Sequence, residues 1–134
     1  MLDQFLTALP NFLIYFAAAI TLMAAFLVVY INITPYQEIS LIRANNMAAA
    51  VSLAGSLLGF ALPIANVIAH SDTLLDLALW GLVAGVVQLV AYRIARLTLP
   101  QLDQDIPAGR MAPAIFLATL SITVGLLNTA CLSY

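Results

Sequence analysis

Four long apolar runs dominate this chain of 134 residues and constrain its fold more than any other feature. A helix that crosses the hydrocarbon core of a bilayer needs about 20 mostly apolar residues, because each residue adds about 1.5 Å. The runs cover residues 12–31, 47–69, 74–99 and 111–132. Only four arginines, no lysines and six carboxylates occur in the whole chain. The sequence therefore predicts an all-α integral membrane protein with four transmembrane helices in a single domain.

Prolines indicate where two of these helices end and where one is disturbed. Pro10 suits the first turn of a helix, where its missing N–H costs no hydrogen bond, so the first helix should begin near it. Pro35 and Pro100 should close the first and third helices. Pro63 lies inside the second helix and should kink it, because it cannot donate to the carbonyl of Gly59.

The placement of arginine predicts how the chain is inserted. Arg43 lies between the first and second helices, and Arg93, Arg96 and Arg110 flank the connection between the third and fourth. Because basic residues stay on the cytoplasmic side, we expect both of these connections to be cytoplasmic and both termini to be extracytoplasmic. The net charge of −2 and the lack of a basic surface exclude nucleic acid as a partner.

The two halves of the chain look like copies of one another, with a period of about 64 to 65 residues. The prolines after the first and third helices correspond, and residues 46–50, which open the second helix, match residues 110–114, which open the fourth. Repeat one would cover about residues 1–70 and repeat two about 71–134. Each half holds two spans, so we expect two parallel two-helix repeats related by an axis along the membrane normal.

Each helix carries one face of small or polar residues at alternating steps of three and four. In the last three helices this face comprises Ser52, Ser56, Gly59, Pro63, Asn66, Gly81, Gly85, Gln88, Ser121, Gly125 and Asn128. In the first helix it comprises Ala18, Thr21, Ala25, Val28 and Asn32. Small residues let helix backbones approach, and amides are costly against lipid, so these faces should point into the bundle. Leu57 lies off its face and should contact lipid.

These faces have two interpretations, helix packing and a polar path. No ionisable residue lies at the centre of any span, whereas a proton or ion pathway normally places one there. Hydroxyls and amides are common hydrogen-bonding groups between membrane helices. We therefore favour packing, with the amides of Asn66 and Asn128 bonded to neighbouring helices.

Residue patterns for chemistry are sparse. His70, Asp72 and Asp76 lie close in sequence, but one histidine and two interfacial carboxylates are typical of a polar turn rather than a metal site. The serines have no histidine base in reach, so an enzyme is not expected, and neither is a cofactor. The mixed-charge connections are the candidate docking surface for a partner. Their candidate residues are Glu38, Arg43, Asn46 and Arg110.

The pattern of residues resembles a known family over nearly the whole chain. The first half carries it in residues 38–43, Asn46, residues 48–50, Gly55 and residues 59–63. The second half carries it in Trp80, Gly81, Gln88, Gly109, Ala112, Ala114, Ile115 and residues 125–128. The chain is similar to the family catalogued as domain of unknown function number 350, the YjfL-like bacterial inner-membrane proteins. Arg110 departs from the pattern, because an asparagine is expected after the glycine.

The resemblance implies a bacterial inner-membrane protein with four helices in two repeats, and it implies no activity. We expect a non-enzymatic structural or accessory component of a membrane assembly. Its partners would be the lipid bilayer and either further copies of the chain or another membrane protein. The alternative is a small oligomeric channel or transporter.

Overall fold

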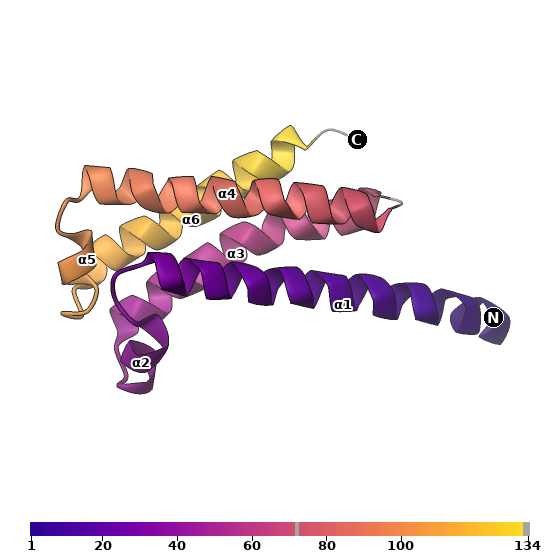
Figure 1. Cartoon of the computed structure of the whole chain (residues 1–134), viewed down its shortest axis with the longest axis horizontal. Helices are drawn as coiled ribbons and strands as arrows, with labels where there is room; N and C mark the ends of the chain where they lie inside the picture. The colour runs from indigo at the N-terminus through magenta and orange to yellow at the C-terminus, as the bar shows by residue number, and fades with distance from the viewer. Residues whose placement is uncertain (72, 133–134) are drawn as a thin grey trace.

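The computed structural model of the chain describes residues 1–71 and 73–132, most of which are helical (Figure 1). The helices are α1 (Leu2–Ile33), α2 (Glu38–Arg43), α3 (Met47–His70), α4 (Leu74–Thr98), α5 (Leu102–Asp105) and α6 (Met111–Cys131). Within these described ranges there is no strand. The helices α1, α3, α4 and α6 are each long and apolar enough to cross a membrane, which confirms the four predicted spans.

The ends of three long helices agree with the apolar runs to within one residue, but α1 does not. It begins at Leu2, so the prediction that Pro10 opens the first helix was wrong, and Pro10 lies inside α1. Proline there removes one backbone bond, to the carbonyl of Leu6, which a continuing helix tolerates at a modest cost. In the turns of α1 that precede Pro10, the Thr7 hydroxyl donates to the carbonyl of Asp3 at 2.8 Å, a bond within the same helix.

The long helices differ in how deeply they are packed. In the most apolar segment of α3, 56% of the residues are buried, against 28% for α4, 28% for α6 and only 6% for α1. α3 and α6 pack closely along their lengths, and α4 lies against both. In Figure 1 the start of α1 and the end of α6 lie at one end of the bundle and the short helices α2 and α5 lie at the other, which we call the α2–α5 end.

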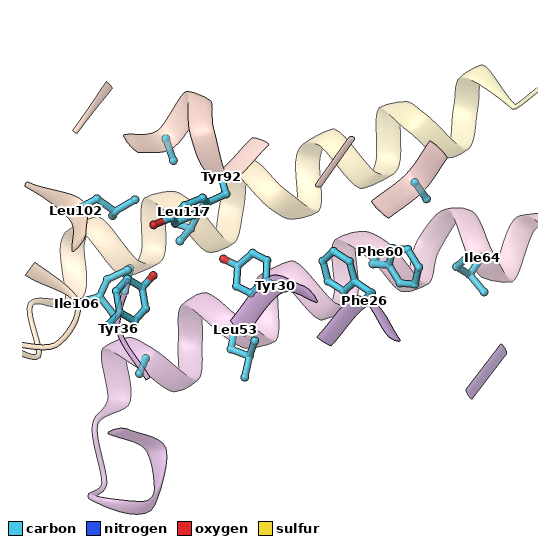
Figure 2. Packing of buried hydrophobic residues seen from close by; sticks show 14 of the residues in the cluster. Phe26, Tyr30, Tyr36, Leu53, Phe60, Ile64, Tyr92, Leu102, Ile106 and Leu117 are labelled. Atoms are coloured by element: carbon cyan, nitrogen blue, oxygen red, sulfur yellow. The ribbon is translucent and has the colours of Figure 1, made fainter. Parts of the chain in front are cut away.

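The buried face of α1 is not the face that the sequence predicted. Phe26 and Tyr30 are buried, whereas Thr21 and Ala25 are exposed. The Phe26 ring stacks on Phe60 of α3 with a centroid separation of 4.4 Å (Figure 2). Aromatic stacking of this kind adds to the packing energy, so the second half of α1 turns Phe26 and Tyr30 inward, whereas Phe12 and Phe16 in the first half are exposed.

Two further expectations can be compared with the packing of α3. Leu57 was expected to contact lipid, but it is partly buried against the core, and it is the adjacent Leu58 that is exposed. Pro63 is buried, and α3 continues through it to His70. The parallel two-repeat arrangement stays a prediction.

Candidate functional site: a buried polar seam

The most polar part of the bundle interior lies where α3, α4 and α6 meet. Ser52, Ser56, Gln88 and Ser121 are each 1% exposed, and we call these four residues the polar seam. The Ser56 and Ser121 hydroxyl oxygens lie 3.4 Å apart, and the Gln88 Nε2 donates to the Ser121 carbonyl at 3.0 Å. The Ser52 hydroxyl donates to the carbonyl of Ala49 at 3.1 Å. The seam therefore links three helices through hydrogen bonds that lipid could not supply.

Three glycines bring the backbones of α3 and α6 into direct contact beside this seam. A Cβ atom on Gly55 would overlap the Cα of Ala118, and one on Gly59 would overlap the carbonyl oxygen of Ser121. A Cβ atom on Gly125 would overlap the carbonyl oxygen of Gly59. The carbonyl of Gly59 is the one that Pro63 leaves without its usual donor. The missing side chains therefore set the distance between the two helices.

The glycines of α4 play a different part. A Cβ atom on Gly81 would come 3.0 Å from a methyl carbon of Leu22, and one on Gly85 would lie 3.7 Å from the ring of Phe60. Both positions face side chains rather than a backbone, and the space at Gly85 would accept a methyl group. The spacing Gly81–Gly85 therefore does not mark a close backbone crossing, although a glycine pair four residues apart is typical of one.

Asn66 of α3 and Asn128 of α6, which follow the seam residues along their helices, differ in their contacts. The Asn66 Nδ2 donates to the carbonyl of Thr129 on α6 at 3.4 Å, as the packing interpretation requires. Asn128 is partly buried, and its side chain makes no hydrogen bond within the described residues. The Thr129 hydroxyl bonds its own helix, at the carbonyl of Gly125, at 2.8 Å.

Toward the α2–α5 end, three tyrosines extend the polar interior. Tyr30, Tyr36 and Tyr92 are all buried, and the Tyr30 and Tyr92 rings meet edge to face at 5.8 Å. Figure 2 shows the hydroxyl groups of Tyr30 and Tyr36 inside the packed cluster. Neither hydroxyl has a hydrogen-bond partner among the described residues, and the same holds for Oε1 of Gln88. An unpartnered buried polar atom is costly, so these three atoms are the least satisfied part of the core.

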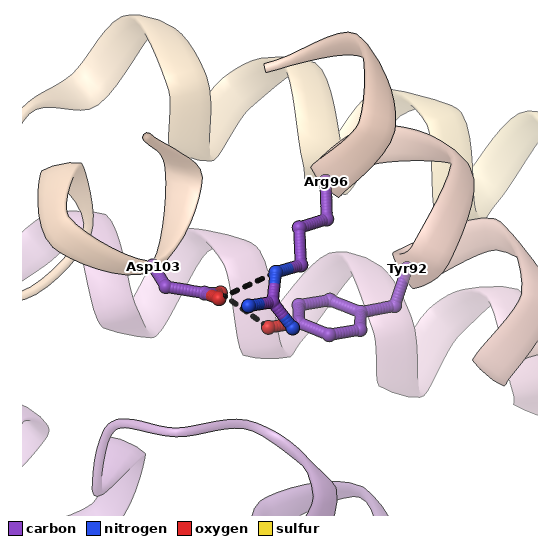
Figure 3. A network of polar contacts seen from close by, with 3 residues as sticks. All are labelled: Tyr92, Arg96 and Asp103. Carbon is purple, nitrogen blue, oxygen red and sulfur yellow. Dashed lines mark hydrogen bonds and ion pairs between the residues drawn. The ribbon is translucent and has the colours of Figure 1, made fainter. Parts of the chain in front are cut away.

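Two carboxylates are held at this end by neighbouring side chains. The Thr34 hydroxyl lies 2.8 Å from each carboxylate oxygen of Glu38. Burial raises the pKa of the Glu38 carboxyl above its ordinary value, and the Thr34 hydrogen bond acts in the opposite direction. Asp103 accepts a short hydrogen bond from the Tyr92 hydroxyl and an ion pair from Nε of Arg96 at 2.8 Å (Figure 3). Glu38 therefore links α2 to the end of α1, and Asp103 links α5 to α4.

The four candidate docking residues do not share one environment. Glu38 is 1% exposed, so it is not available to a partner, because its carboxylate turns inward to Thr34. Asn46 caps α3 by accepting from the amide of Ala49 at 3.1 Å, and its Nδ2 donates to two carbonyls before α6. Arg43 and Arg110 are exposed, and Arg110 lies 3.4 Å from Asp105.

The described residues contain no group of three His, Cys, Asp or Glu side chains that could hold a metal ion. Asp72, part of the sequence cluster with His70 and Asp76, lies outside the described residues. The Nδ1 of His70 lies 2.9 Å from the carbonyl of Asn66 on the preceding turn of α3.

Sequence reasoning missed the buried tyrosines and the burial of Glu38. Tyrosines near helix ends are typical of membrane interfaces, and a glutamate in a connection is typically solvated. The available signal was the spacing Phe26–Tyr30–Thr34, which repeats every four residues and leads directly to Glu38. That spacing defines the inward face of α1.

Comparisons with known proteins place the chain in a family. The family model described as Domain of Unknown Function (DUF350) matches residues 4–132. The inner membrane protein YjfL of Escherichia coli strain K12 is 33% identical over 129 residues, which cover 96% of this chain and 98% of the relative. The transmembrane protein YshE of Bacillus subtilis is 30% identical over 114 residues, which cover 81% and 82%. No solved structure matches the chain significantly. The chain therefore belongs to the DUF350 family and is a four-helix integral membrane protein whose relatives include inner membrane proteins.

Proposed function

We propose that this chain is a non-enzymatic component of a membrane assembly and that it self-associates through one face of α1. The observation that carries the proposal is the uneven burial of the spans, 6% for the apolar segment of α1 against 56% for that of α3. The polar seam holds three buried hydroxyls. Those of Ser56 and Ser121 contact one another, that of Ser52 donates to the Ala49 carbonyl, and none contacts a base among the described residues. A nucleophile needs such a base, so a scaffolding role fits this interior better than catalysis.

The exposed face of α1 has the composition of a helix–helix contact. Its residues, which we call the α1 stripe, are Ala17, Thr21, Ala25, Val28 and Asn32, and all five are exposed. Thr21 and Asn32 bond the carbonyls of their own helix at 2.8 and 2.7 Å, so the stripe presents a compact surface. Small residues at four-residue spacing allow two membrane helices to approach closely. The stripe is uncharged and fits a second copy of itself, as a two-fold interface requires.

Disulfide trapping in native membranes tests this contact. In a chain with Cys131→Ser, the variant Ala25→Cys should give a covalent dimer under mild oxidation. Two copies inserted the same way place residue 25 at equal depth on both sides of the contact, within the reach of a disulfide. The matched control is Leu126→Cys, which is 53% exposed and lies on α6, outside the stripe.

Trapping at residue 25 but not at residue 126 is the expected result. Equal yields at both positions would indicate random collisions and would contradict the proposal. Absence of dimer at residue 25, in membranes where the protein is intact, would contradict it as well.

We also propose that both termini are extracytoplasmic and that the halves 1–70 and 71–134 are duplicated copies. The topology is supported by the four arginines, because Arg43 ends α2, Arg93 and Arg96 lie near the end of α4, and Arg110 directly precedes α6. The duplication is supported by Ser56 and Ser121, which face each other 65 residues apart. It is supported too by Asn45 and Gly109, which have φ of 67° and 81° shortly before α3 and α6. An active alkaline phosphatase fused after Tyr134 is expected, and an inactive, well-expressed fusion would refute the topology.

The alternative function, a small channel or transporter, has one observation in its favour. Tyr30, Tyr36 and Gln88 each bury a polar atom without a partner among the described residues, and water or an ion could satisfy such atoms. Against it, the contact of Gly59 with Gly125 fills the space between α3 and α6, so no path runs between these two helices there. Liposomes with pure protein should therefore pass no more ions than empty ones. Reproducible currents that change in a Gln88→Leu variant would favour the alternative.

A further inference from the structure

Two arginines near the end of α4 line a cavity of about 410 Å³. Its lining residues are Arg93, Arg96, Leu97 and Pro100. Arg96 already forms one ion pair, between its Nε and the Asp103 carboxylate at 2.8 Å. Arg93 is exposed, and its guanidinium has no hydrogen bond or ion pair within the described residues. The site therefore carries a net positive charge even after Asp103 is counted.

The surroundings of Arg93 belong to the lipid-facing surface of α4. Val90 and Leu97, one turn before and one turn after it, are 49% and 82% exposed. The rise from Leu74, where α4 begins, to Arg93 is about 28 Å, which is close to the thickness of a hydrocarbon core. An arginine at this depth buries its aliphatic stem against acyl chains and brings its guanidinium to the level of the headgroups.

We propose that Arg93 and Arg96 bind the phosphate of an anionic phospholipid headgroup. A guanidinium presents paired N–H donors that match phosphate oxygens. An anionic headgroup would balance the positive charge of the two arginines that Asp103 does not neutralise. The acyl chains of the same lipid cover the exposed leucine and valine side chains of α4. A lipid fits both chemistries of the site, whereas a free anion would satisfy only the arginines. The proposal does not depend on self-association through α1.

The test compares lipid retention by the purified protein in detergent micelles, measured by native mass spectrometry. Micelles are doped with either phosphatidylglycerol or phosphatidylcholine. The wild-type chain should retain phosphatidylglycerol in preference, and Arg93→Gln should weaken that retention about fivefold, the usual effect of one arginine near an anionic surface. Arg93→Lys, which keeps the charge, should retain most of the preference. Melting temperatures in phosphatidylcholine confirm that each variant is folded.

Arg43→Gln is the matched control, because Arg43 is also exposed and unpaired within the described residues but lies on α2, outside the cavity. It should leave the preference for phosphatidylglycerol unchanged. Equal losses in Arg43→Gln and Arg93→Gln would show general attraction to negative charge and would overturn the site. So would a wild-type chain that retains both lipids equally. Complete displacement of phosphatidylglycerol by millimolar inorganic phosphate would show a free-anion site and would overturn the lipid assignment.

Discussion

Helices α1 and α3 are both apolar enough to cross a membrane, yet α3 is the most buried span and α1 the least. Hydrophobicity does not explain the difference, since α1 is the more apolar of the two and lipid is as apolar as leucine. The difference follows from where the small residues point. Gly55 and Gly59 of α3 face the backbone of α6, whereas Ala25 of α1 faces outward. In a membrane, close backbone contact rather than apolar surface therefore decides which helix forms the centre.

The largest expected effect is that of a leucine placed at the centre of α3. In Gly59→Leu the new side chain overlaps the Ser121 carbonyl and the Gln88 amide, so we expect the free energy of unfolding to fall by about 3 kcal/mol or more. The control is Leu58→Ala, which trims a lipid-facing side chain and should change stability by less than about 0.5 kcal/mol. Denaturant titration of both variants in one detergent gives the two values. Similar losses would mean that the assigned facing of α3 is incorrect.

A smaller change separates the backbone contact from ordinary packing. Gly125→Ala adds a methyl group that overlaps the Gly59 carbonyl, and we expect a loss of about 2 kcal/mol. Gly85→Ala adds the same group where the nearest atom is 3.7 Å away, so the higher helix propensity of alanine should leave stability unchanged or slightly raised. Thermal unfolding of the pair measures this. A greater loss of stability in Gly85→Ala than in Gly125→Ala would contradict the assignment of the tight backbone contact to α3 and α6.

Substitutions of asparagine compare the same helices, with smaller expected changes in stability. Asn66→Leu removes a bond from α3 to the Thr129 carbonyl and should cost about 1 kcal/mol or less, because the bond is long. Asn32→Leu on α1 removes a bond only to the carbonyl of Val28 in the same helix, and Asn128→Leu removes no side-chain hydrogen bond found among the described residues. Both should leave the melting temperature nearly unchanged. A loss at Asn128 equal to that at Asn66 would show that the Asn128 side chain also stabilises a contact between helices.

The smallest effect concerns the end of α1 that is attached to the bundle. Burial raises the pKa of the Glu38 carboxyl above its ordinary value of 4.5, so the folded state favours the neutral acid. The stability from this group is present below pH 4.5 and is lost as the pH rises through the folded pKa. Glu38→Gln stays neutral at every pH and should remove this part of the pH dependence. Unfolding at several pH values above 4.5 measures the slope, and an unchanged slope in the variant would assign it to another group.

The sequence predicted the spans well and the contacts unevenly. The bounds of α3, α4 and α6 follow from long apolar runs that end at polar residues or proline, such as Asn46 and Pro100. The inward face of α3 follows from its glycines, because in lipid only small residues let backbones meet. The same rule gave the wrong face for α1. Small residues such as Thr21 and Ala25 show that another helix can approach closely, but they do not show whether that helix belongs to the same chain or to a second copy.

Charge patterns misled in one place and could not decide in another. Glu38 was expected on a docking surface, but its carboxylate is buried and bonded to the Thr34 hydroxyl, an environment that depends on tertiary contacts. The partner of Asp103 could not be chosen from sequence, because Arg93, Arg96 and Arg110 are all close to it along the chain. The structure pairs it with Arg96, which leaves Arg93 free for the proposed lipid.

The most direct test of the account is energy transfer between chains labelled on α1 and diluted into excess lipid. Wild-type chains should show transfer that persists on dilution, and Ala25→Leu should abolish it, because a large side chain on the α1 stripe keeps two backbones apart. In detergent diluted enough to separate wild-type chains, the melting temperature of Ala25→Leu should equal that of the wild type, since residue 25 is exposed in the single chain. Transfer that persists unchanged in Ala25→Leu, or a melting temperature that falls as it does in Gly59→Leu, would contradict the claim that α1 serves other chains while α3 serves its own.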